Sequence, residues 1–195
     1  MPLKIINKES QFIIPILLCL FFFFIINIKG LFNISDLSYY SSLIINEPHR
    51  IIIYGFVHKD FNHLLSNLFG IIVVRYCFLN LNLKNKYLFL YLIIFLIPIQ
   101  TIFLLILDKF ILINYRNLLV GFSGVLFGAY TFIFFSSLLG KKNFFNIFIG
   151  LEKSSEIKNL MILCLSLGLI YSFLPSISLS GHLAGILSGF IIFFL

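Results

Sequence analysis

Residues 87–107, with the sequence YLFLYLIIFLIPIQTIFLLIL, decide the class of fold, because this long run is apolar and carries no charged side chain. A helix of about 20 apolar residues crosses the hydrocarbon core of a lipid bilayer. The whole chain has the same character: 61% of its 195 residues are hydrophobic and 11% are charged, whereas an average soluble domain has about 25% charged residues. The run therefore indicates an all-α protein embedded in a membrane.

Apolar segments on both sides of this run complete a set of six predicted membrane spans. They lie at residues 11–28, 60–78, 87–107, 122–139, 157–174 and 180–195. The first is longer than the apolar part of a signal peptide, and no small-residue cleavage site follows it, so we expect it to be kept as a helix. The spans occupy nearly the whole chain, which we interpret as one domain, residues 1–195.

The distribution of positive charge predicts how these spans are oriented. With the N-terminus inside, nine of the 14 Lys and Arg residues fall in inner segments and five fall in outer ones. Because Lys and Arg are enriched on the cytoplasmic side, this bias favours a bundle with both termini inside. The net charge of +7 is spread over short loops, where it sets topology and meets anionic lipid headgroups, so nucleic acid is not an expected partner. The long, partly apolar outer loop 29–59 is expected at the membrane interface.

Polar side chains inside the predicted spans are the candidates for function, because burying them in a membrane is costly. Span two opens near HKDFNHLLSNLFG (58–70), span four near GFSGVLFG (121–128) and span six near SLSGHLAGILSGF (178–190). These three spans run in the same direction. His63, Asn67, Ser123 and His182 are therefore all predicted at one depth, in the outer half of the bundle, where they would form a single polar site.

The residue types at this depth fit acyl transfer by a serine. The seven acidic residues lie outside the span cores, so a Ser-His-Asp triad lacks an obvious acid, but a Ser-His dyad needs none. His182 can act as the general base that takes the proton of Ser123. The expected donors to an oxyanion are the backbone N–H of Ser123, the Asn67 amide and a ring N–H of His63.

The glycines near these residues predict sharp turns and close helix packing. Gly121 and Gly124 are expected to let the backbone turn beside the serine and let a substrate approach. Gly124 and Gly128 form a GxxxG pattern, as do the glycines at 181, 185 and 189. Such small faces let membrane helices approach closely, and close packing of spans four and six would bring His182 to Ser123.

Other interpretations of the same residues are open at this point. Taken alone, the Ser123 segment is explained better by helix packing than by chemistry. The segment with His63 and Asn67, and that with His182, are each explained equally well by hydrogen bonding between helices. A metal site built from His58, His63 and His182 is disfavoured, because the first two do not share a helix face and no HExxH pattern occurs. A transporter would be expected to carry acids or broken helices inside its spans. No cofactor is expected.

Taken together, the three polar segments resemble the rhomboid family of intramembrane serine proteases. HKDFNHLLSNLFG resembles the family pattern His-(x4)-His-(x3)-Asn, GFSGVLFG its Gly-x-Ser-Gly followed by Phe-Gly, and GHLAGILSG its glycine-rich last helix. Their order and spacing fit across nearly the whole chain. The resemblance implies these roles: nucleophile Ser123, base His182, oxyanion-hole residues Asn67 and His63, ring contact to His182 from Phe127, and a supporting residue, His58.

The resemblance also implies an activity and its setting. It implies a serine endopeptidase that cleaves peptide bonds in or next to transmembrane segments, with single-span membrane proteins and the bilayer as partners. The uncharged loop 173–181 and span five would form the gate for the substrate, and a bacterial cytoplasmic membrane is the simplest location. The alternative is an inactive rhomboid-like protein that binds membrane clients. The oligomeric state is left open.

The sequence departs from the family pattern at two places. Many bacterial members carry a Trp-Arg pair in the first outer loop; here Arg50 follows His49, and the chain has no Trp. Some members carry a glutamate near the inner end of span two, where this chain has Arg75 and no acid. Both departures concern loop docking and helix packing, so they put stability and substrate gating in doubt more than the dyad.

Overall fold

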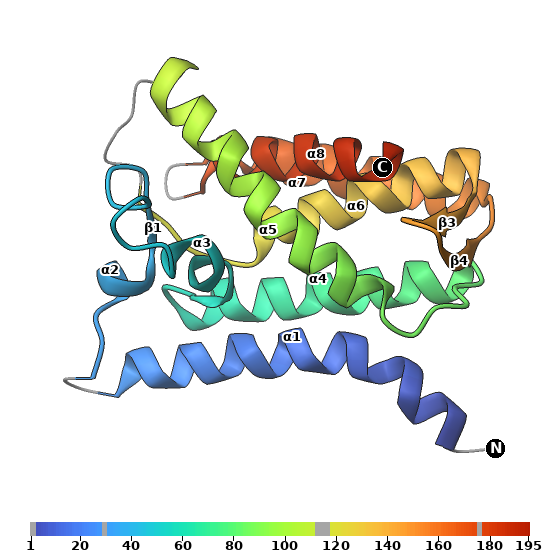
Figure 1. Cartoon of the computed structure of the whole chain (residues 1–195), viewed down its shortest axis with the longest axis horizontal. Coiled ribbons are helices and arrows are strands. Elements are labelled where there is room, and N and C mark those ends of the chain that lie inside the picture. The colour runs from blue at the N-terminus through green and yellow to red at the C-terminus, as the bar shows by residue number, and fades with distance from the viewer. Residues whose placement is uncertain (1–2, 29–30, 112–117, 175–176) are drawn as a thin grey trace.

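The computed structural model describes residues 3–28, 31–111, 118–174 and 177–195, and most of them are helical (Figure 1). Loops with short elements cap the two ends of the helical bundle. In chain order the elements are α1 (Leu3–Asn27), α2 (Ile34–Leu37), β1 (Tyr39–Tyr40), α3 (Arg50–Ile53), η1 (Tyr54–Phe56), α4 (Phe61–Asn80), α5 (Leu88–Ile106), η2 (Leu107–Ile111), β2 (Leu118–Leu119), α6 (Ser123–Leu139), β3 (Lys141–Phe144), β4 (Ile147–Leu151), α7 (Ser155–Tyr171) and α8 (Leu179–Phe194).

Helices lie where the apolar segments predicted spans, so the mostly helical membrane architecture is confirmed. Among the described residues, three helical stretches are long and apolar enough to cross a membrane: Glu9–Asn27, Phe61–Asn80 and Leu88–Ile111. Helices α6 and α8 are shorter but also apolar. The count of six spans, and the orientation with both termini inside, stay predictions.

Helix α6 occupies the centre of the bundle. Its residues from Gly124 to Ile133 are all buried, as expected for a helix that is apolar on every side. It packs against α4, α5, α7 and α8, and the contact with α8 is the most extensive. Figure 1 shows α4, α6 and α8 beginning towards the same end of the bundle, near α3, while α1 lies along one edge beside α4.

Glycines join α6 to α8 without intervening side chains. A Cβ atom built on Gly185 would lie 2.1 Å from the carbonyl oxygen of Gly124, and one on Gly189 would lie 2.1 Å from that of Gly128. Real Cβ atoms essentially never come under 3.0 Å, so hydrogen is the only side chain that fits. The GxxxG faces predicted from the sequence therefore meet, one turn apart, along the same seam.

The first helix is tied to α4 by an ion pair that the sequence did not predict. Arg75 donates from Nε and from an Nη atom to the two carboxylate oxygens of Glu9, at 2.6 Å and 2.8 Å. A two-pronged contact of this kind is the strongest geometry for an arginine–carboxylate pair. The acid absent beside Arg75 in α4 is thus supplied by α1.

Buried polar contacts hold the first loop together, and a short strand pairing joins it to the bundle. Arg50 is buried and donates to Glu47 and to the carbonyl oxygens of Ser35 and Ser38. These three acceptors belong to the loop itself, so the arginine holds the loop together without an adjacent Trp. The loop also pairs strand β1 with β2, which leads into α6.

Helix α5 continues further than predicted, through a π-helical turn, η2. The predicted span ended at residue 107, but the helical stretch runs to Ile111 and includes the fully buried Asp108. The Tyr39 hydroxyl donates to the Asp108 carboxylate at 3.1 Å, and so links the first loop to α5. Burial and the neighbouring carboxylate raise the pKa of Tyr39 well above its usual range, which keeps this hydroxyl a donor.

Between α6 and α7 the chain forms the antiparallel hairpin β3–β4, where the sequence predicted only an inner loop. Phe145 and Asn146 have φ values of 44° and 63°, as in a tight two-residue hairpin turn. The Lys141 ammonium donates to the carbonyl oxygen of Phe193 at the end of α8. A positive charge at a helix C-terminus is favourable, so this contact fixes the hairpin against α8.

Candidate active site

Ser123 is the first residue of α6, directly after a sharp turn at Gly121. Gly121 has φ +117°, a backbone conformation that residues other than glycine rarely adopt. Its N–H donates to the Tyr54 carbonyl oxygen at 3.0 Å, so the docked first loop fixes the turn. At the start of a helix, the backbone N–H of Ser123 has no partner within that helix.

His182 lies in the first turn of α8 and reaches Ser123 across the glycine seam. Ser178 caps this helix by accepting from the Gly181 N–H at 3.0 Å. The Nε2 atom of His182 is 2.9 Å from the Ser123 Oγ atom, which is hydrogen-bonding distance. The structure therefore brings together the two residues that the sequence proposed as nucleophile and base.

Phe127 holds the His182 ring from one face. The two rings are stacked with centroids 4.1 Å apart and an interplanar angle of 14°. The tip of the phenyl ring rests on α7, where a Cβ atom built on Gly168 would lie 2.4 Å from the Phe127 Cζ atom. Gly168 thus leaves the room that the ring needs.

The remaining ring nitrogen of His182 has a partner that the sequence analysis missed. Its Nδ1 atom lies 2.5 Å from the Ser172 Oγ atom. Ser172 is buried at the end of α7. No motif marks it, because a lone serine in an apolar segment is common and its pairing with His182 appears only in the folded chain.

His63 and Asn67 lie on one face of α4 and point towards the turn before Ser123. A Cβ atom built on Gly121 would lie 2.5 Å from the His63 Nε2 atom and 3.5 Å from the Asn67 Nδ2 atom. Asn67 is buried, and its Nδ2 atom has no hydrogen-bond partner among the described residues. Two side-chain nitrogens of α4 thus converge on the backbone next to the serine.

Local contacts hold His63 at the start of α4. Asp60 caps the helix by accepting from the His63 backbone N–H at 2.8 Å. His58 packs its ring edge-on against the His63 ring, with centroids 5.0 Å apart. His58 is itself fixed by a 3.0 Å hydrogen bond from Nδ1 to the Phe56 carbonyl oxygen.

His58 supports the site indirectly, through its contact with the His63 ring. Burial, and to a smaller extent the neighbouring His63, lower the pKa of His58 to about 4. The ring is therefore neutral at physiological pH, and its Nδ1–H is free to donate to Phe56. Within the described ranges, no three side chains of His, Cys, Asp or Glu gather where they could hold a metal ion.

The arrangement provides the parts needed for nucleophilic attack. Ser123 carries a hydroxyl within reach of an imidazole nitrogen, Phe127 fixes the ring plane, and the nitrogens of His63 and Asn67 face the same backbone turn. A nucleophile, an oriented base and nearby donors are the minimum set for acyl transfer.

Comparison with known proteins agrees with this arrangement. A sequence model of the rhomboid domain matches residues 46–195. The matched stretch includes Ser123, His182 and the pair on α4. A search of curated proteins found no relative of this chain. Because the match covers most of the chain, and the helices are those of an integral membrane protein, the chain belongs to the rhomboid family.

Proposed function

We propose that this rhomboid is an intramembrane serine endopeptidase that cleaves peptide bonds in or next to transmembrane segments of other proteins. Rhomboids are in general intramembrane serine proteases, and the proposal extends that activity to this chain. The observation that supports it most is the 2.9 Å contact between the His182 Nε2 atom and the Ser123 Oγ atom. A purely structural serine would not need a base held on its hydroxyl.

The first half of the proposed reaction forms an acyl-enzyme. The Ser123 Oγ atom attacks the carbonyl carbon of the scissile bond while its proton moves to the His182 Nε2 atom. The carbonyl oxygen becomes an oxyanion. His182 then gives the proton to the leaving amine nitrogen, the C–N bond breaks, and the acyl group stays on Ser123 as an ester.

The second half hydrolyses that ester. A water molecule gives a proton to the His182 Nε2 atom and attacks the ester carbonyl. The collapse of the second tetrahedral intermediate breaks the bond to Oγ, which takes the proton back from His182. Bulk lipid supplies no water, so in this proposal the site is open to the aqueous side on which α4, α6 and α8 begin.

Both oxyanions need donors that are in place before the reaction. We assign this role to the backbone N–H of Ser123, the Asn67 Nδ2 atom and the ring of His63. Burying an amide N–H without a hydrogen-bond partner costs free energy. In this proposal the Asn67 amide gains a partner when the substrate oxygen occupies the site. The enzyme then binds the transition state, in which the oxygen becomes negatively charged, more strongly than it binds the substrate.

Replacing Asn67 with Ala is expected to lower turnover by roughly 10²-fold, the lower end of the range for one lost oxyanion donor. The measurement is the steady-state rate of cleavage of a single-span reporter protein in detergent. Asn62→Ala is the matched control, because Asn62 is exposed on the same helix, and its rate should equal that of wild type. An unchanged rate in Asn67→Ala would remove this residue from the oxyanion hole.

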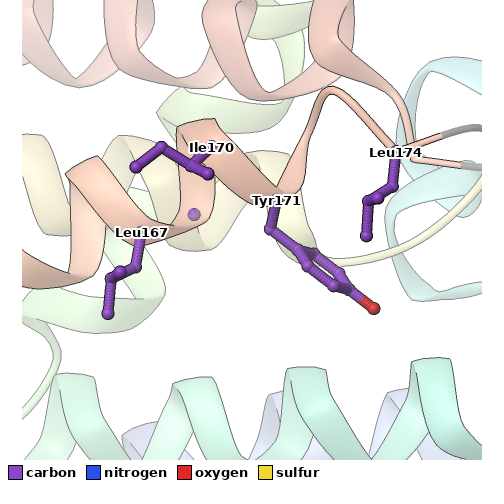
Figure 2. A pocket seen from close by; sticks show the side chains of 5 residues that line it. Leu167, Ile170, Tyr171 and Leu174 are labelled. Carbon is purple, nitrogen blue, oxygen red and sulfur yellow. The ribbon is translucent and has the colours of Figure 1, made fainter.

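We propose that the substrate helix approaches along α7, at the loop predicted as the gate. Figure 2 shows Leu167, Ile170, Tyr171 and Leu174 along the end of this helix and the turn that follows it. Together with Gly168 they line a shallow apolar hollow of about 550 Å³. Within the gate loop 173–181, residues 175–176 lie outside the described residues. The apolar lining suits a transmembrane segment as partner.

The substrate class and location follow from the same proposal. Membrane proteins with one transmembrane helix are the expected substrates, and helix-weak segments should be favoured because the scissile bond must unwind to reach Ser123. A bacterial cytoplasmic membrane is the proposed location.

Labelling with a fluorophosphonate tests the proposal, because this probe forms a covalent bond with an activated serine and loses fluoride. Purified wild-type protein in detergent is expected to be labelled, and Ser123→Ala and His182→Ala are expected to lose the label. His49→Ala, which changes an exposed histidine, should label like wild type. A folded wild-type protein that takes up no label would support the alternative, an inactive protein that binds membrane clients.

A further inference from the structure

The imidazole of His182 is held at both ring nitrogens, by side chains from two different helices. Its Nε2 atom faces Ser123 on α6, and its Nδ1 atom lies 2.5 Å from the Ser172 Oγ atom at the end of α7. Both His182 and Ser172 are buried. The contact to Ser172 is a side-chain contact of His182 that the proposed dyad does not use.

Counting protons fixes the direction of these hydrogen bonds. The Ser172 hydroxyl has one proton, and it donates this proton to the Gly168 carbonyl oxygen at 2.7 Å. In its contact with His182 the hydroxyl must then accept, so Nδ1 carries the ring proton and donates. A neutral imidazole has one such proton, and Nε2 is therefore left with a lone pair that accepts from the Ser123 hydroxyl.

We propose that Ser172 is a positioning residue that selects the Nδ1–H tautomer of His182 and so keeps Nε2 available as the base. The inference rests on the proposed protease function. In a Ser-His-Asp triad a carboxylate does this by accepting from Nδ1–H. Here a neutral hydroxyl, oriented by a helix carbonyl, does the same work.

The backbone of α7 holds this hydroxyl in place. The Ser172 N–H donates to the carbonyl oxygens of Gly168 and Leu169, each at 3.0 Å, so the residue continues the helical geometry. Gly168 therefore has two roles: its carbonyl oxygen accepts the hydrogen bond from the Ser172 hydroxyl, and its missing side chain makes room for Phe127. The end of α7 thereby holds His182 through Nδ1 and supports the α6 side chain, Phe127, that stacks on its ring.

The opposite polarity would give an inactive pair, and it differs in a measurable way. If Ser172 donated to Nδ1, the ring proton would sit on Nε2 and would point at the Ser123 oxygen. Nε2 could then not accept the serine proton. The two arrangements have the same heavy-atom positions but different protonated nitrogens, so nitrogen NMR distinguishes them.

Kinetics of Ser172 variants provide the first test. Ser172→Ala is expected to lower kcat roughly tenfold, the scale of one net hydrogen bond. KM should be unchanged, because Ser172 is buried and is not among the residues that line the apolar hollow on α7. Ser172→Thr retains the hydroxyl and should restore most of the rate. Ser166→Ala, at an exposed position of the same helix, is the control. An unchanged kcat in Ser172→Ala, or no recovery in Ser172→Thr, would overturn the inference.

The second test uses wild-type protein and does not depend on how the variants fold. The ¹⁵N spectrum of protein labelled at histidine, assigned by subtracting the spectrum of His182→Ala, should show a protonated Nδ1 and an unprotonated Nε2. A protonated Nε2 in the neutral ring would overturn the inference even if the enzyme is active. Failure of the protease proposal would appear separately, as wild-type protein that neither cleaves nor takes up fluorophosphonate.

Discussion

Ser123→Ala is expected to abolish cleavage of a transmembrane reporter, with kcat falling by roughly 10⁶-fold, the scale reported when a serine protease loses its nucleophile. The fold should survive, because Ser123 is the first residue of α6 and its side chain does not contribute to the glycine seam. His182→Ala should cause a loss of similar size. Since the two residues act as a unit, the double variant should lose no more than either single one.

Release of product from a purified reporter, followed over hours, measures this loss. Ser136→Ala is the matched control: this serine is buried on the same helix, and its Oγ atom has no hydrogen-bond partner in the described part of the chain. It should cleave at the wild-type rate. Residual cleavage by Ser123→Ala within tenfold of wild type would mean that another group is the nucleophile.

Gly185→Ala is expected to cause the largest loss of stability, about 3 kcal/mol, at the upper end of what overpacking of a core usually costs. The new methyl group would meet the Gly124 carbonyl oxygen, which belongs to the backbone and cannot rotate away. The helices α6 and α8 must then separate, and His182, one turn from Gly185, would leave Ser123. Activity should therefore fall together with stability.

Unfolding in mixed detergent micelles, followed by circular dichroism, measures the change. Gly55→Ala is a suitable control, because a Cβ atom there would lie 3.8 Å from the Ile97 side chain, an ordinary contact distance. Its unfolding should match that of wild type. If Gly185→Ala unfolded at the same denaturant concentration as wild type, the close contact of the two backbones would be refuted.

The sequence predicted those parts of the fold that depend on regular spacing. Apolar length located the helices, and glycines four residues apart predicted the contact of spans four and six. Residues at the same depth on parallel spans predicted the meeting of His182 with Ser123. Each of these follows from helix geometry, in which side chains four residues apart share a face.

Contacts between single residues far apart in the chain were not predictable in this way. Glu9 with Arg75 and Tyr39 with Asp108 each join helices or loops whose relative rotation the sequence does not determine. The contact of Ser172 with His182 was not predictable either, because it depends on how α7 and α8 pack. Asp108 was also hidden by the predicted end of span three, since a charge after an apolar run normally marks the end of a helix in the membrane.

The contact between the backbones of α6 and α8 limits which amino-acid substitutions this protein can accept during evolution. Where side chains set the distance between helices, many combinations of equal volume are tolerated. Here the carbonyl oxygens of Gly124 and Gly128 set it directly, against Gly185 and Gly189. Exposed Phe and Ile side chains on the surface of the bundle are therefore far less constrained than Gly185 and Gly189, which accept no substitute.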